Sequence, residues 1–247
     1  MDANPNDVVT ILIVNSDNLA PSQFDAAFKT AGADTLSYSP PSASLPASGW
    51  PTLGSLIDSG TRLVTFLSTT ADFTSVPYLI DEFTNVWETA YDVTDTTFNC
   101  DVNRTNGDTS TQMFLINHFL DQIIIGFPAP DVTQANTTNG VSGVGSLGQQ
   151  VQTCATEYGR NPNFLLVDFY EYGGGSVFQV AATANGVDYS PSTSVATPMA
   201  QGSATNTASA SSTSTPNTAI SFHLGQGSVC ATLAMVIGVA LGAMNIV

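Results

Sequence analysis

Six polar side chains directly follow apolar runs of the sequence, at points where folding can bring them together. They are two amides, two carboxylates, an imidazole and a phenol: Asn15, Asn117, Asp17, Asp168, His118 and Tyr170. An imidazole titrates close to neutral pH and therefore suits proton transfer. Carboxylates can hold a divalent cation, so Asp17 with Asp168 is a candidate cation site, although the spacing follows no metal-binding motif.

The apolar runs themselves predict buried strands. Runs at 8–14, 63–67, 113–116 and 164–167 are continuous rather than alternating, which is typical of a parallel sheet. Helical patterns lie between them: one from Pro21 to Gly32, one opened by Pro51, one after Pro77 with Leu79, Ile80, Phe83 and Trp87 at helical spacing, and a short one over 177–184. This alternation indicates an α/β fold whose site lies at the carboxyl ends of the strands.

A structural role is the simpler interpretation for several of the charged residues. For His118 we favour a hydrogen-bonding role beside Asn117 over direct catalysis. Asp81 and Glu82 are expected to be solvated helix residues, while the role of Glu88 is left open. The cations that a phosphate site would need are few, and Arg62 falls at the amino end of its strand. The basic residues are Lys29, Arg62, Arg104 and Arg160.

Composition excludes a nucleic-acid partner. The 247 residues carry 20 acidic and 4 basic side chains, a formal charge of −16, so the chain cannot neutralise a run of phosphates. A hydrophobic content of 43% is enough for a core, and every charged residue lies between Asp2 and Asp188. We therefore expect residues 1–190 to form the globular part.

The neutral end of the sequence divides into two segments. Residues 191–217 are rich in Ser, Thr and Ala, which predicts a disordered linker, either an O-glycosylated stalk or an unmodified tail. Residues 218–247, with an apolar run at 229–247, match a GPI-attachment signal. Asn217 is the preferred attachment residue and Ser214 the second choice. The alternative is a C-terminal apolar helix that anchors the chain by its tail.

Other features indicate the secretory pathway. Cys100 and Cys154 remain once the tail is removed and suggest one disulfide, the alternative being two free buried thiols. Asn103 and Asn136 begin glycosylation sequons. The N-terminal segment MDANPNDVV has neither the basic nor the apolar region of a signal peptide, so we expect the sequence to be incomplete at its start.

A glycine motif needs separate treatment. Gly143, Gly145 and Gly148 fit the spacing G-x-G-x-x-G, and Asp168 follows twenty residues later. The preceding segment TQANTTNGVS is polar and not a strand, so we do not expect a dinucleotide site.

Several strings of the sequence occur together in one family. ANPNDVVTILIVN, WPTLGSLIDSGTRLVTFL, VPYLIDEFTNVWETAYDVTD, MFLINHFLD, PNFLLVDFY and GSVFQVAATANGV follow one another in this order. Together they resemble the fungal PLC-like phosphodiesterases, relatives of the catalytic domain of phosphatidylinositol-specific phospholipase C. The resemblance covers about residues 2–187 and implies the C-terminal part of a distorted TIM barrel, a secreted protein, and often a GPI-anchored tail.

The resemblance also implies phosphodiester cleavage by two histidines, one taking a proton from the nucleophilic hydroxyl and one protonating the leaving oxygen. Both histidines of the family precede the part that this sequence matches, and no position here corresponds to them. Asp168 resembles the carboxylate that orients one of them, the alternative being a helix cap or loop acceptor. We therefore expect a truncated, catalytically silent phosphodiesterase domain of lipid metabolism with a phospholipid-like substrate for the full protein; the alternative is a non-catalytic, GPI-anchored cell-surface or cell-wall protein.

Overall fold

The first parallel sheet contains the amino-terminal strands. In the computed structural model, which describes residue 1 and residues 3–198, β1 (Val9–Ile13), β2 (Leu63–Leu67) and β3 (Leu79–Asp81) are arranged in the order β1-β2-β3. All pairs are parallel, with Ile11 opposite Thr65 and Thr65 opposite Leu79. The strands expected at 8–14 and 63–67 are confirmed.

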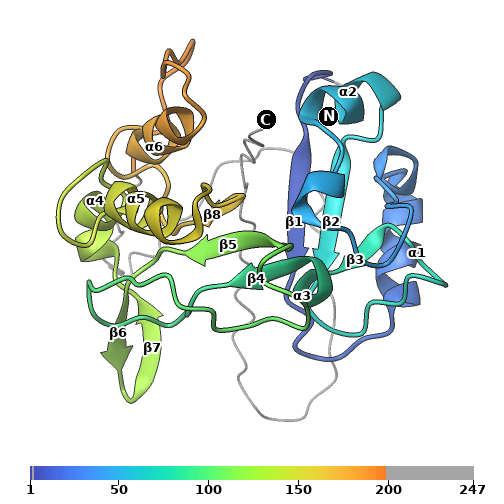
Figure 1. Cartoon of the computed structure of the whole chain (residues 1–247), viewed down its shortest axis with the longest axis horizontal. Helices are drawn as coiled ribbons and strands as arrows, with labels where there is room; N and C mark the ends of the chain where they lie inside the picture. The colour runs from blue at the N-terminus through green and yellow to red at the C-terminus, as the bar shows by residue number, and fades with distance from the viewer. Residues whose placement is uncertain (2, 199–247) are drawn as a thin grey trace, which may run out of the picture. The chain divides into compact units, whose positions relative to one another are not determined.

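A second parallel sheet contains β4 (Val86–Glu88), β5 (Met113–Asn117) and β8 (Phe164–Leu166), in the order β4-β5-β8. β5 and β8 confirm the other two expected strands. Both sheets run in parallel and alternate with helices, so the α/β class is confirmed (Figure 1). The strands of the described residues do not close into a ring.

The prediction of a helix after Pro77 is wrong. The segment is a strand, a single helical turn and another strand: β3, α3 (Glu82–Asn85) and β4. The Asp81 side chain accepts a hydrogen bond from the Thr84 amide at 2.7 Å and begins the turn. On either side, parallel pairing with β2 and β5 satisfies the backbone instead. Asp81 is therefore a helix cap and not a free surface residue.

The remaining helices cover the sheets. They are α1 (Pro21–Ala31), α2 (Leu53–Ser59), α4 (Ala135–Thr138), α5 (Leu147–Tyr158) and α6 (Ser176–Ala184), with short 3-10 turns at Asp34–Leu36, Ala47–Gly49 and Val132–Gln134. α1 ends at Gly32, as predicted, where φ is +69° and glycine avoids the steric penalty. Its inner face packs Phe24 and Phe28 against the first sheet.

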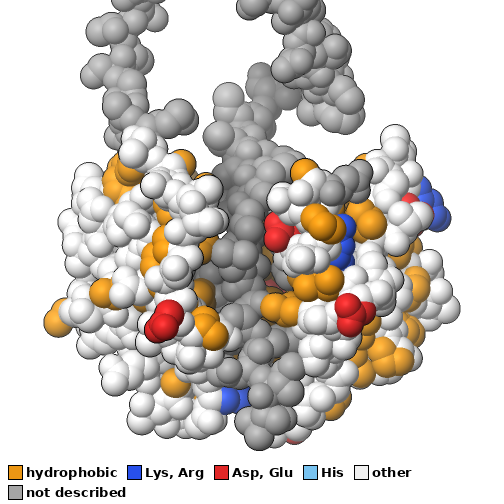
Figure 2. All heavy atoms as spheres, turned by 90° about the horizontal axis from the view of Figure 1, so that it is seen from above, with side chains coloured by type: hydrophobic (Ala, Val, Ile, Leu, Met, Phe, Trp, Pro, Cys, Tyr) orange, Lys and Arg blue, Asp and Glu red, His pale blue; other side chains and the backbone are white. Residues whose placement is uncertain are grey.

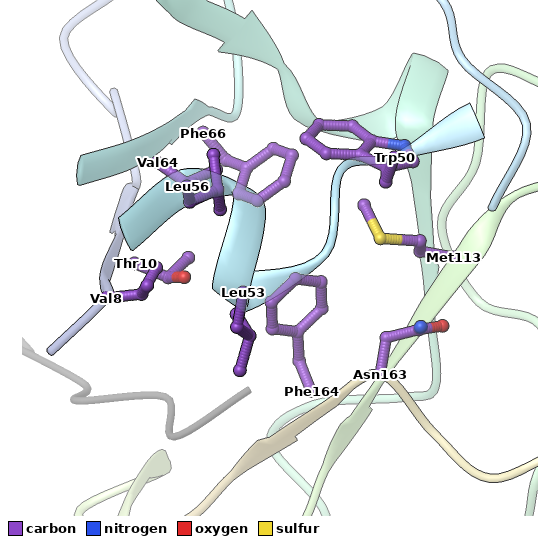
Figure 3. A pocket seen from close by; sticks show the side chains of 10 residues that line it. All are labelled: Val8, Thr10, Trp50, Leu53, Leu56, Val64, Phe66, Met113, Asn163 and Phe164. Atoms are coloured by element: carbon purple, nitrogen blue, oxygen red, sulfur yellow. The ribbon is translucent and has the colours of Figure 1, made fainter. Parts of the chain in front are cut away.

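One apolar cluster joins the two sheets. The ring centroids of Phe66 in β2 and Phe164 in β8 lie 5.7 Å apart, edge to face, and the Trp50 ring lies 5.7 Å from Phe66 at a tilt of 44°. A cavity of about 30 Å³ lies among these side chains and is lined mostly by apolar groups (Figure 3). It has room for a water molecule but not for a substrate.

An antiparallel hairpin interrupts the alternation. β6 (Asp121–Ile124) and β7 (Phe127–Pro130) follow β5 and pair only with each other. In the part of the chain that the structure describes, no helix is both long and apolar enough to cross a bilayer. The attachment residue Asn217, most of the expected linker and the apolar run 229–247 lie outside the described residues.

Candidate functional site

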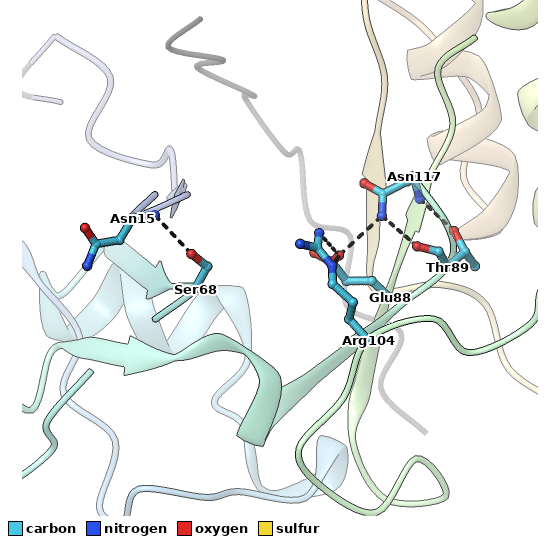
Figure 4. A network of polar contacts seen from close by, with 6 residues as sticks. All are labelled: Asn15, Ser68, Glu88, Thr89, Arg104 and Asn117. Carbon is cyan, nitrogen blue, oxygen red and sulfur yellow. Dashed lines mark hydrogen bonds and ion pairs between the residues drawn. The ribbon is translucent and has the colours of Figure 1, made fainter. Parts of the chain in front are cut away.

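A mostly buried polar group lies around the carboxyl ends of β4 and β5. We call it the Glu88 cluster, and its members are Glu82, Glu88, Thr89, Arg104 and Asn117. The Arg104 guanidinium donates to Glu88 Oε2 from Nε at 2.9 Å and also from Nη2. The Asn117 amide donates to the Thr89 carbonyl at 2.9 Å and lies 3.4 Å from Glu88 Oε2. Figure 4 shows Glu88, Thr89, Arg104 and Asn117 converging from three segments of the chain.

Arg104 is held by backbone and by aromatic rings. The Glu88 amide donates to the Arg104 carbonyl at 3.0 Å, which places the two residues opposite each other. The guanidinium lies over the Phe83 ring at 5.0 Å and the Tyr91 ring at 4.3 Å, and such contacts are attractive. Arg104 is therefore a fixed counter-charge to Glu88, which is almost fully buried.

Glu82 and Glu88 form a pair of buried carboxyl groups. Burial, followed by the hydrogen bond and charge of Glu88, raises the pKa of Glu82 to about 10. At neutral pH Glu82 therefore keeps its proton, and Arg104 balances the charge of Glu88. The expectation that Glu82 is solvated is wrong, because the short turn α3 directs it inward rather than along an exposed helix.

Asn15 organises a separate polar group at the ends of β1 and β2. Its amide nitrogen Nδ2 donates to Thr70 Oγ1 at 2.8 Å and to the Leu19 carbonyl at 3.0 Å, and its main-chain amide donates to Ser68 Oγ at 3.0 Å (Figure 4). These bonds join the loop after β1 to the loop after β2. Asn15 is thus a buried connector, whereas the neighbouring Asp17 is exposed.

His118 is fully buried. Its Nε2 lies 2.8 Å from the Thr138 carbonyl and its Nδ1 2.6 Å from Gln150 Oε1, and the Phe98 ring packs on it at 4.1 Å. Burial lowers the pKa of His118, although its hydrogen bonds to Gln150, Thr138 and Gly145 act in the opposite direction. The ring therefore fastens α4 and α5 to the end of β5.

Asp168 follows β8 without reaching His118. Its main-chain carbonyl accepts from Asn139 Nδ2 at 2.9 Å, and burial raises the pKa of its carboxyl. The charge of Asp168 acts on Asp121. Burial and the charges of Asp92 and Asp168 raise the pKa of Asp121 to about 6. Tyr170 is half-exposed and packs its ring edge against Phe178. The expected site residues thus fall into separate groups.

All four basic side chains are already engaged. Lys29 pairs with Asp25 at 2.7 Å, Arg160 donates to the Gln112 carbonyl at 2.6 Å, and Arg62 donates to main-chain carbonyls of the first seven residues at 2.9 Å. Few charged side chains appear on the face seen in Figure 2. The described residues contain no group of three or more His, Cys, Asp or Glu side chains placed to hold a metal ion. Each of the four basic side chains therefore already has an acceptor within the protein.

The cysteines and sequons lie outside these groups. Cys100 and Cys154 are joined as a disulfide with a Cα–Cα distance of 5.3 Å, which ties the loop after β4 to α5. Asn103 and Asn136 are both exposed, and their glycosylation stays a prediction.

Several members of these groups were not predicted from the sequence, Arg104 and Gln150 among them. Arg104 was noted only as one of four cations, yet it neutralises Glu88 across 16 residues. Gln150, the partner of His118, lies on α5, which was not predicted. The signals for α5 were present: Ser146 caps its start, accepting from the Gln149 amide at 3.2 Å, and Gly159 ends it.

The fold and these strand-end groups define a parallel α/β domain with buried polar clusters at the carboxyl ends of its strands. Residues 1–185 match the family model described as PI-PLC X 1, and the chain belongs to this PI-PLC X domain family. No solved structure gives a significant match.

Two relatives come from the fungus Arthroderma benhamiae. One, named an uncharacterized secreted protein, is 41% identical over 196 residues, which are 75% of this chain and 44% of the relative. The other, named PI-PLC X domain-containing protein 1, is 40% identical over 190 residues, which are 76% of this chain and 61% of the relative. The chain thus spans about half the length of the curated relatives that it matches.

Proposed function

We propose that this chain is the C-terminal part of a PI-PLC X-type domain whose class hydrolyses phosphoric diesters, including those of lipids. The family match over residues 1–185 supports the class. The two parallel sheets are linked through the single turn α3 and have the strand orders β1-β2-β3 and β4-β5-β8. This arrangement suits an arc of a (β/α) barrel. In such a barrel Asp168 would orient a histidine from the rest of the domain.

We further propose that this polypeptide is catalytically silent, an inference carried by the position of His118. The sequence has two histidines, His118 and His223, and His223 lies outside the described residues. His118 is fully buried, and both of its ring nitrogens already have partners. A general acid or base must reach the proton that it transfers, and the nitrogens of this ring face Thr138 and Gln150 inside the protein.

The test is hydrolysis by the full 247-residue chain. Phosphatidylinositol in mixed micelles and bis(p-nitrophenyl) phosphate serve as lipid and soluble diesters, and H118Q is the matched control. The proposal predicts no rate above buffer for either protein. A rate that H118Q abolishes would overturn it. Translation of the genomic sequence upstream of Met1 complements this assay: an in-frame segment with two histidines and a signal peptide would support an active, longer enzyme.

A second candidate is a non-catalytic extracellular protein that keeps the fold. The connecting roles of Asn15, Asn117 and His118 favour it, because each serves the structure rather than an open site. An extracellular location fits the Cys100–Cys154 disulfide and the relative named a secreted protein. We propose glycosylation at Asn103 and Asn136 and a GPI anchor at Asn217. N103Q, N136Q and N217Q would each change the mass or membrane release of the cellular protein if this is correct.

A further inference from the structure

The hairpin β6–β7 exposes large apolar side chains in an unusual concentration. Ile125 at its tip is 92% exposed, Phe127 is 73% exposed, Ile123 60% and Ile124 49%. Neighbouring residues of a strand point to opposite faces, so these side chains make both faces of the hairpin apolar. No charged side chain lies between Gln122 and Pro130. Figure 1 shows the hairpin projecting from the rest of the labelled elements.

The turn of this hairpin adopts a conformation that its sequence does not favour. Ile125 and Gly126 form the two-residue loop, with φ of +51° and +83°. Positive φ suits Asn or Gly at both positions, whereas a β-branched residue there is a steric outlier. Because Ile125 is almost wholly exposed, packing within the chain does not compensate for the strain. The apolar side chain at the tip therefore has another reason to be there.

Two prolines block the outer edge of β7. The pair Ile124–Phe127 flanks the turn and exchanges hydrogen bonds. The alternate pairs, which contain Pro128 and Pro130, therefore direct their backbone nitrogens outward. Proline has no N–H at those positions, so the edge offers no donors for another strand. The two prolines also leave the hairpin without two N–H donors that would have no hydrogen-bond partner in an apolar medium.

We propose that the β6–β7 hairpin inserts its tip into the surface layer of a lipid bilayer. A protein partner would cover one face of the hairpin or extend an edge, but here both faces and the tip are exposed, and proline blocks the β7 edge. Hydrocarbon contacts every side of an inserted tip equally. With a net charge of −16 and no cation in the hairpin, insertion should favour zwitterionic over anionic lipid.

The base of the hairpin lies beside the strand-end groups. β6 begins four residues after Asn117, and the Asp131 amide closes the base on the Leu120 carbonyl at 2.8 Å. An inserted hairpin would therefore place the carboxyl end of β5 at the lipid surface. The inference does not depend on phosphodiester chemistry, because insertion is measured without any turnover.

A tryptophan reporter tests insertion in the full chain. F127W places an indole on the hairpin, whereas Trp50 and Trp87 are buried and give a constant background. The signal is quenching by brominated phosphatidylcholine vesicles, which reports the hairpin and not the apolar segment 229–247. We expect a blue shift with strong quenching in phosphatidylcholine, and weaker quenching when phosphatidylserine is added. No quenching beyond that of the unsubstituted chain would overturn the proposal.

I125N in the F127W background separates insertion from folding. Asn suits the positive φ at position 125, so the melting temperature should rise. The equilibrium constant for insertion should fall about tenfold or more, since an exposed isoleucine is lost. V187N replaces an exposed valine after α6 and is the control. It should change both the melting temperature and the equilibrium constant for insertion by less than I125N does. Equal insertion by I125N and its parent would overturn the proposal. The proposal would also be overturned if Ile125 were needed for self-association or for binding a protein while brominated lipid caused no quenching.

Discussion

The Nε2 atom of His118 lies 2.8 Å from the main-chain oxygen of Thr138, a group that can only accept a hydrogen bond. Nε2 therefore carries the proton of a neutral ring. Nδ1 faces Gln150 Oε1 at 2.6 Å, while Gln150 Nε2 donates to the Asn99 carbonyl at 2.8 Å. A neutral imidazole has one N–H, so one of these contacts lacks a proton, and turning the Gln150 amide would only move the missing proton to its contact with the Asn99 carbonyl. Both ring nitrogens of His118 thus face buried groups of the protein.

Replacing His118 should cost stability. H118A leaves the Thr138 carbonyl and Gln150 without their partner and opens a cavity, so we expect a loss of about 2–4 kcal/mol in the free energy of unfolding. H118Q retains an amide donor and should cost less. Urea denaturation of the full chain measures both. Equal stability of H118A and the parent protein would contradict a structural role.

Glu82 should make the protein less stable as the pH rises. Its pKa is about 10 in the folded protein against an ordinary value of 4.5, so the unfolded chain releases a proton that the folded chain keeps. Stability from this group is complete below about pH 4.5 and is lost toward pH 10, by at most about 1.4 kcal/mol per pH unit.

E82Q imitates the protonated form and should remove this dependence. We expect E82Q to become progressively more stable than the parent protein between pH 5 and pH 9, measured by denaturation at each pH. E157Q, an exposed substitution on α5, controls for the change in net charge. A constant difference between E82Q and the parent across that range would refute the buried, protonated state.

The disulfide should contribute substantially to stability. Cys100 and Cys154 are separated by 54 residues, and closing a loop of that length in the unfolded chain corresponds to about 4 kcal/mol. The double variant C100A/C154A should lose an amount of this order in denaturant unfolding. A reducing agent should destabilise the parent protein but not the double variant; an equal effect on both would contradict this contribution of the disulfide.

The glycine motif should be structural. A Cβ at Gly148 would lie 1.9 Å from the Val141 carbonyl oxygen, a backbone atom that cannot give way cheaply. We expect G148A to lose about 1–3 kcal/mol or more. G54A in α2 is the matched control, because its nearest neighbour lies 3.7 Å away, and it should gain up to about 1 kcal/mol. Thermal denaturation ranks the two, and the reverse order would contradict this packing.

Much of the fold could be predicted because its strands are unusually clear in the sequence. β1 and β2 are continuous β-branched and aromatic runs, and Pro21 with Gly32 bounds α1. The segment containing Leu79 and Trp87 was wrongly predicted as a helix. Its two three-residue strands around a single turn place apolar residues at the intervals that are typical of a helix. Tertiary pairing with β2 and β5 decided its structure.

The site was less predictable because its contacts are long-range. The expectation that the strand-end residues meet was only partly met: Asn117 joins Glu88, but Asn15 and His118 belong to other groups. No local pattern indicates that Arg104 will face Glu88, or that Gln150 will meet His118 from 32 residues away. Side-chain partners of this kind depend on how the sheets and α5 pack.

The most direct test of the buried, inert histidine is an NMR titration of the imidazole in the full chain, with H118Q used to assign its signals apart from those of His223. Burial lowers the pKa of His118, so we expect the midpoint of its ring titration to lie below the ordinary histidine value. A titration centred at or above the ordinary histidine value of about 6.5 would show an accessible ring and contradict the account.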